Sequence, residues 1–221
     1  MYLAHSSIRK ADALATQTQI TPRQRLPWCV PAGANLFRDG DPCSGLFEIV
    51  AGTVRLSRLT RDGRRTVTGF GFPGDILGFG PGGHHIADCD VVSDAKVIRH
   101  PQDGLHGPGA DHDQQQLLVN GALRQVAALQ DHCMLLGRTL ARDRVAAFLS
   151  LLGDRLGVPL GDYVAFDLPM ARADIADHLG LTNETVSRCL TELRQAKLIA
   201  IENLYHIVLL RPQYLAALAK A

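Results

Sequence analysis

Residues 172–193 decide the fold prediction, and they read RADIADHLGLTNETVSRCLTEL. A small residue, Ala176, stands where a second helix would cross closely, and Gly180 stands at a tight turn, where a left-handed backbone is cheap only for glycine. Apolar residues recur at helical spacing on both sides of that turn: Ile175, Leu179, Val186, Cys189, Leu190 and Leu193. The pattern predicts two crossed helices with a shared core, which is the helix-turn-helix arrangement.

The second of these helices carries polar side chains on its first two turns. Thr182 is placed to cap it, since its hydroxyl can accept from an exposed backbone N–H. Glu184, Ser187 and Arg188 stand at positions i, i+3 and i+4, so they share one face. Arginine can contact guanine O6 and N7 together, and a carboxylate can accept from the amine of cytosine or adenine. We predict DNA contacts from Glu184, Ser187, Arg188, Thr182, Asn183 and Thr185.

A simpler interpretation exists for two of these residues. Glu184 and Arg188 are four apart, and on an arbitrary helix such a pair is an exposed ion pair worth roughly 0.3 to 0.5 kcal/mol. Inside the whole pattern the base-reading interpretation is favoured. The flanks extend the motif, because residues 198–201 and 206–210 predict a β-hairpin, the wing of a winged helix. We also expect helices over 144–156 and 212–220 and an extended piece over 163–168.

Upstream, from about residue 30 to residue 100, short β-type runs alternate with glycine and turn residues. Examples are 46–50, 53–59 and 66–70. Asp62-Gly63 is typical of a hairpin turn, because glycine accepts positive φ. Alternation within the runs and closely spaced turns predict an antiparallel β-roll of the cupin-like jelly-roll type. An unrelated small β-sandwich would fit this half almost as well.

Between these two parts, residues 114–142 contain no proline and only two glycines. Their apolar residues alternate at intervals of three and four, a heptad seam: Val119, Ala122, Val126, Leu129, Cys133, Leu136 and Leu140. A helix over this span would be roughly 43 Å long, more than one small barrel can bury. We therefore expect a dimerisation helix. The alternative is a stripe that packs wholly against its own domain.

Composition sets limits on function. The 221 residues are 46% hydrophobic and 20% charged with a formal net charge of +1, which is ordinary for a globular protein and gives no global attraction to nucleic acid. From Asp143 onward there are eight basic and nine acidic residues, which weighs against strong non-specific DNA affinity. Neither a Ser/His/Asp set, nor a carboxylate pair, nor a P-loop is evident, so we expect no enzyme, no catalytic residues and no cofactor.

The sequence lacks both the apolar runs of signal peptides or membrane spans and the regular cysteine spacing of metal or disulfide sites. The first twenty residues hold no apolar run of signal-peptide length and no segment approaches a membrane span, so we expect a cytoplasmic protein without a membrane partner. The five cysteines stand at wide, irregular spacing, which predicts free thiols and no metal site.

The motif from Asp174 to Arg188, DIADxLGLTxETVSR, together with the order of β-roll, long helix and winged helix, resembles the CRP/FNR family of bacterial transcription regulators over about residues 28–221. The resemblance implies a homodimeric activator in which Glu184, Ser187 and Arg188 read each half of a palindromic operator, with RNA polymerase as a partner. The Glu-x-x-Ser-Arg spelling is similar to the FNR/FixK branch, with TTGAT-like half-sites. The CRP branch has glycine at the Ser187 position and arginine at the Asn183 position.

Departures from the family pattern bear on the signal. Only Cys29 lies where iron–sulfur members carry a cysteine cluster, and the stretch 78–85, GFGPGGHH, lacks the acid and arginine of cyclic-nucleotide members. What remains resembles FixK-like regulators. A haem- or redox-dependent sensor of nitric oxide or oxygen is the alternative function.

Two groups carry that alternative. His84 and His85 could ligate haem, although adjacent histidines in such a loop are expected to be exposed. Cys189 is expected to pack between the two helices, while its oxidation would repel phosphate and weaken DNA binding. The expected organisation is α+β: a disordered arm over 1–25, a sensor-type β-roll over 26–112, the dimerisation helix over 113–142 and the winged helix-turn-helix over 143–221.

Overall fold

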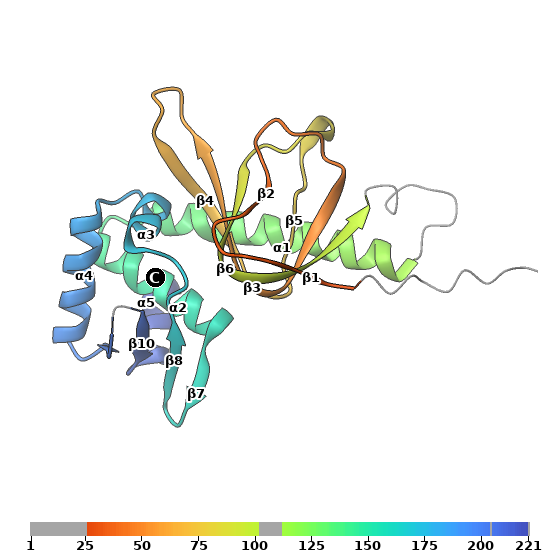
Figure 1. Ribbon diagram of the computed structural model, residues 1–221. Helices are drawn as coiled ribbons and strands as arrows, with labels where there is room; N and C mark the ends of the chain where they lie inside the picture. Colours follow the sequence, from red (N-terminus) through yellow and green to blue (C-terminus); the bar gives the residue numbers. More distant parts are fainter. Residues whose placement is uncertain (1–25, 102–111, 204, 221) are drawn as a thin grey trace, which may run out of the picture.

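A computed structural model describes residues 26–101, 112–203 and 205–220, so the expected arm over 1–25 lies outside the described residues. A curled antiparallel sheet forms the N-terminal part, a long helix runs along it, and a cluster of helices with a small sheet forms the C-terminal part (Figure 1). This is the α+β architecture that the sequence predicts.

The N-terminal sheet is the expected β-roll. Its strands are β1 (Trp28–Val30), β2 (Asn35–Phe37), β3 (Gly45–Leu59), β4 (Arg65–Gly71), β5 (Ile76–Leu77) and β6 (Asp88–Pro101), with a 3-10 turn at Pro81–Gly83. Strand β6 pairs with β1, β2 and β3, and β3 also pairs with β4 and β5, all antiparallel. The inward side chains, among them Ile49, Val54 and Val97, are buried.

Two β-type runs that the sequence separates at Gly52 form one strand, β3. Gly52 has a φ of +84°, and a Cβ there would lie 2.4 Å from the Asp94 carbonyl oxygen. The pairing of β3 with β6 shifts register on both sides of this point. Glycine therefore bends the strand without ending it. The predicted hairpin turn at Asp62-Gly63 is confirmed, with Gly63 at a φ of +79°.

The long helix is shorter than expected. Helix α1 covers His112–Leu136, and α2 covers Ala141–Leu156, so the prediction of one helix over 114–142 is wrong at its end. At the end of α1, the Gly137 amide donates a hydrogen bond to the Cys133 carbonyl at 3.0 Å. The Arg144 guanidinium fixes the bend, because it donates to the Arg138 and Leu179 carbonyls at 2.8 and 3.2 Å. No helix in the described part of the chain is long and apolar enough to cross a membrane.

The C-terminal part is a winged helix-turn-helix. Its elements after α2 are β7 (Val158–Leu160), β8 (Tyr163–Asp167), α3 (Arg172–Leu179), α4 (Asn183–Gln195), β9 (Ile199–Ile201), β10 (His206–Leu209) and α5 (Pro212–Lys220). The sheet order is β7-β8-β10-β9, in which β9 and β10 are the predicted wing. Strand β7 was not expected, because its three residues are exposed and give no burial pattern.

The two parts share one apolar core. Phe72, at the end of β4, is 3% exposed and belongs to the same buried cluster as the residues of α2, α3 and α4. Phe70 lies with its ring centroid 6.0 Å from Phe148 of α2 and 5.2 Å from His178 of α3. Helix α3 therefore packs against the roll as well as against α4.

His178 should make the stability of this junction depend on pH. Its Nδ1 donates to the Val67 carbonyl at 3.2 Å, and its ring stacks on His132 of α1 at 3.9 Å. Burial, followed by repulsion from His132, lowers the pKa of His178 to about 3. The unfolded chain binds this proton more readily, so stability present above the ordinary histidine pKa is lost as pH falls below it, by at most about 1.4 kcal/mol per pH unit.

The measurement is the free energy of unfolding in urea between pH 7 and pH 4. We expect the wild-type chain to lose stability more steeply over this range than His178→Gln, which cannot take up the proton. Parallel curves for the two proteins would show that His178 does not contribute to the slope.

Candidate nucleic-acid interface

The turn between α3 and α4 forms as its sequence predicts. Gly180 adopts a left-handed conformation, φ 63° and ψ 38°, and its amide donates to the Ala176 carbonyl. Ala176 itself is 3% exposed, which allows the close crossing of the two helices. All six predicted core residues are buried: Ile175, Leu179, Val186, Cys189, Leu190 and Leu193.

The N-terminus of α4 is capped as expected. The Thr182 hydroxyl oxygen accepts from the Thr185 amide at 3.1 Å and lies 2.8 Å from the Thr185 hydroxyl. Glu184 occupies the first turn, where a carboxylate interacts favourably with the positive end of the helix dipole. Free backbone N–H groups at this end can also bind an anionic oxygen.

The predicted reading residues lie on an uncovered face. Thr182, Asn183, Glu184 and Arg188 are exposed, and Thr185 and Ser187 are half-buried. Helix α4 lies at the outer edge of the molecule, with α3 between it and the roll (Figure 1). None of the salt bridges found among the described residues joins Glu184 to Arg188, so the simpler ion-pair interpretation is not what the structure shows.

Sequence analysis did not single out Arg172, which lies beside this face. Its Nη1 donates to the Ser187 hydroxyl oxygen at 3.3 Å. Because arginine can only donate, Ser187 must accept here, which leaves the serine hydroxyl proton free to donate outward. A fifteen-residue separation between the two side chains gives no sequence signal for this contact, since it depends on how the helices cross.

Cys189 is held in the core between the helices. It is 4% exposed. Burial, reinforced by the carboxylate of Glu192, raises the pKa of its thiol. A thiol with a raised pKa forms little thiolate and is slow to oxidise. These observations favour the packing role over the redox role.

The two histidines of the 78–85 stretch separate in the structure. His84 is exposed, as expected, but His85 is 4% exposed and its ring stacks on Phe37 at a centroid distance of 3.9 Å, so the expectation of an exposed side chain is wrong for His85. Burial lowers the pKa of His85. Among the described residues, no group of three or more His, Cys, Asp and Glu side chains is arranged to hold a metal ion.

The predicted seam on α1 is largely uncovered. Six of its seven members are exposed and Ala122 is half-buried; the five exposed members on α1 are Val119, Val126, Leu129, Cys133 and Leu136. Leu140, also exposed, lies beyond α1 at the start of α2. The structure adds Leu123 and Met134, which are 62% and 74% exposed. The opposite face of α1 packs on the roll, where Leu118 is fully buried.

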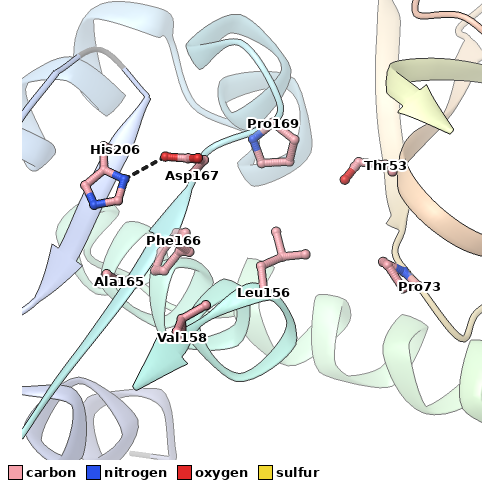
Figure 2. A pocket seen from close by; sticks show the side chains of 10 residues that line it. Thr53, Pro73, Leu156, Val158, Ala165, Phe166, Asp167, Pro169 and His206 are labelled. Atoms are coloured by element: carbon pink, nitrogen blue, oxygen red, sulfur yellow. Dashed lines mark hydrogen bonds and ion pairs between the residues drawn. The ribbon is translucent and has the colours of Figure 1, made fainter. Parts of the chain in front are cut away.

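An open groove of about 380 Å³ lies between the roll and the winged sheet (Figure 2). Thr53 and Pro73 line one side, and Leu156, Val158 and Phe166 are among the residues of the other. The two ionisable side chains that line the groove contact each other, with Asp167 Oδ1 and His206 Nδ1 2.6 Å apart. The rest of the groove lining is mostly apolar, and its two ionisable side chains, Asp167 and His206, already bind each other.

Comparison with known families matches both parts of the chain. Residues 143–218 match the Crp-like helix-turn-helix domain, and residues 28–107 match the cyclic nucleotide-binding domain. Among solved structures, FixK2 from Bradyrhizobium japonicum aligns with a TM-score of 0.77 and 32% identity, covering 87% of this chain and 96% of that one.

Characterised regulators are also similar to this chain in sequence. "Transcriptional activatory protein AadR" of Rhodopseudomonas palustris is 39% identical over 171 residues, which covers 75% of this chain and 70% of the relative. "Nitrogen fixation regulation protein FixK" of Rhizobium meliloti is 34% identical over 186 residues, or 84% of this chain and 83% of the relative. By these matches and by its fold, the chain belongs to the CRP/FNR family of DNA-binding transcription regulators, in its FixK-like branch.

Proposed function

We propose that this chain is a homodimeric transcription activator that binds a palindromic operator with TTGAT-like half-sites. The observation that carries the proposal is the polar first half of α4, where Glu184, Ser187 and Arg188 share one face at the outer edge of the molecule. The activator role is supported by the likeness to AadR, which is described as a transcriptional activatory protein.

Each of the three reading residues suits a different base atom. Arg188 is exposed and could donate to guanine O6 and N7, while Glu184, also exposed, could accept from the amine of cytosine or adenine. Ser187 could donate its hydroxyl proton to a base, because the bond from Arg172 uses only an acceptor position of its oxygen. Thr182, Asn183 and Thr185 at the capped end would contact the phosphate backbone, a contact that positions the helix without reading sequence.

The outward face of α1 supports the homodimer. An exposed apolar stripe that includes Val119, Leu123, Val126 and Leu129 runs along a helix of 25 residues. Contiguous apolar surface of this kind marks an interaction site. A two-fold pairing of α1 helices would place two copies of α4 about one helical turn of DNA apart. RNA polymerase is the further partner that an activator requires.

Base reading is tested by Arg188→Ala. We expect this variant to keep its fold and dimer but to lose roughly 1 to 3 kcal/mol of discrimination, about 5- to 150-fold in the ratio of operator to scrambled-DNA affinity. Selecting bound duplexes from a random pool first supplies the operator, and fluorescence anisotropy then measures both affinities.

The matched control is Arg194→Ala, which removes the same charge from the exposed last turn of α4. It should weaken binding to both duplexes about equally. If Arg188→Ala retains the wild-type ratio, the base-reading assignment is wrong.

The dimer is tested by Val126→Glu on α1. Val126 is 52% exposed on the stripe, so pairing two copies would bring like charges together in an apolar seam. We expect the sedimentation mass to fall to that of the 23.9 kDa monomer. Ala128→Glu is the control, since it adds the same charge at an exposed position on another face of α1. A dimeric Val126→Glu protein would refute this interface.

A further inference from the structure

Two arginines of the roll reach across to the first helix of the helix-turn-helix. Arg55 Nη1 on β3 and Arg65 Nη2 at the start of β4 each lie 2.7 Å from Asp174 Oδ1 on α3. Arg65 also donates to Asp177 Oδ2, from Nη2 at 2.7 Å and from Nε at 3.2 Å. We call these four residues, Arg55, Arg65, Asp174 and Asp177, the latch.

The latch is a built contact, because its central carboxylate is out of solvent. The side chain of Asp174 is 7% exposed, and that of Arg55 is 19% exposed. The second amino group of Arg55 is held by Asp90 Oδ2 at 2.9 Å, and Asp90 accepts in turn from Asn35 at 3.1 Å. A buried carboxylate requires its partners, so removing either arginine while α3 stays on the roll would leave the Asp174 charge buried with less compensation.

The latched arrangement leaves the reading face uncovered. The latch residues Asp174 and Asp177 face the roll, while Glu184 and Arg188 on α4 stay exposed. In Figure 1, α3 separates α4 from the hairpin that carries the arginines. The contact therefore does not block DNA, and it fits the binding-competent form.

The same roll also holds α1. Leu118 is fully buried against it, and a Cβ added at Gly121 would lie 2.9 Å from the Ile76 Cβ. Through the roll, α4 is thus connected to the helix on which a second copy would pair. In such a dimer the separation and tilt of the two reading helices depend on the latch in each protomer. When the two α4 helices are held at a fixed separation, binding of one to its half-site places the other close to the second half-site. The second contact is then an intramolecular step with a high effective concentration.

We propose that Arg55 and Arg65 are positioning residues for DNA binding: by pairing with Asp174 and Asp177 they fix α4 relative to α1, so that one dimer engages both half-sites at once. This rests on the proposed function, because it requires a homodimer and a two-part operator. The arginines touch no base and act through α3.

A charge-swap series in the full chain tests this role. The variants are Arg65→Glu, Asp177→Arg and the two combined, and the probes are a duplex with two inverted TTGAT half-sites and a duplex with one. We expect each single change to lower affinity for the two-site duplex by on the order of tenfold or more, and for the one-site duplex by less than about threefold. The combined variant should regain most of the loss, although residue 65 would still face Asp174.

Arg58→Glu is the matched control. Arg58 also lies on β3, but its side chain is 55% exposed and its carboxylate neighbour is Asp39, at 3.9 Å. The Arg58→Glu variant makes the same charge change at a residue that has no ion pair with α3. Its ratio of two-site to one-site affinity should therefore stay at the wild-type value.

Hydrogen exchange supplies a readout without DNA. In Arg65→Glu the amides of α3 should exchange faster while those of β6 do not, and the combined variant should restore protection. Equal losses of affinity on both duplexes would mean that Arg65 acts by bulk charge and would overturn the proposal. Tighter binding to the two-site duplex would mean that the latch hinders DNA binding. Unchanged binding would mean that the latch has no part in it. If instead the wild-type chain is a monomer, or binds both duplexes equally, the proposed function fails first.

Discussion

Helix α3 is buried on two sides, and that double contact determines the orientation of α4 relative to the roll. Its apolar residues Ile175 and Leu179, each at most 1% exposed, pack with α2 and α4. Its polar residues Asp174 and His178 face β3, β4 and α1. Because one helix of eight residues makes both contacts, the orientation of α4 cannot change without disturbing the core that Phe72 completes.

Apolar and ionic contacts have different tasks at this junction. Burying an aromatic ring such as that of Phe72 contributes roughly 1.5 to 3 kcal/mol, whereas a buried ion pair contributes little net free energy because both charges must be desolvated. The aromatic contacts therefore supply most of the attraction. The pairs of Arg55 and Arg65 with α3 specify a single orientation, since only one arrangement satisfies a carboxylate that is nearly out of solvent.

The sequence predicted those features that local interactions decide. The cap at Thr182, the turn at Gly180 and the spacing of the shared core involve residues a few positions apart, and each formed as expected. The end of α1 was missed because the Arg144 guanidinium holds the bend by binding the Leu179 carbonyl of α3, 35 residues away in the sequence. The latch lies further beyond sequence patterns, since Arg55 and Asp174 are 119 residues apart. The exposure of His85 was mispredicted for the same reason, because its stacking partner Phe37 lies on β2, far from it in the sequence.

The small excess of acidic residues from Asp143 onward weighs less against DNA affinity once the fold is known. Two of the nine acids counted there, Asp174 and Asp177, are neutralised by arginines that lie outside that range. Asp167 pairs at 2.6 Å with His206, the residue opposite it on β10 of the wing. In the proposed complex, a phosphate backbone near α4 would therefore meet the local field of the capped helix end, Glu184, Arg172 and Arg188, and not the net charge of the whole segment. Because salt dependence reports the phosphates neutralised on binding, its slope should follow these local groups.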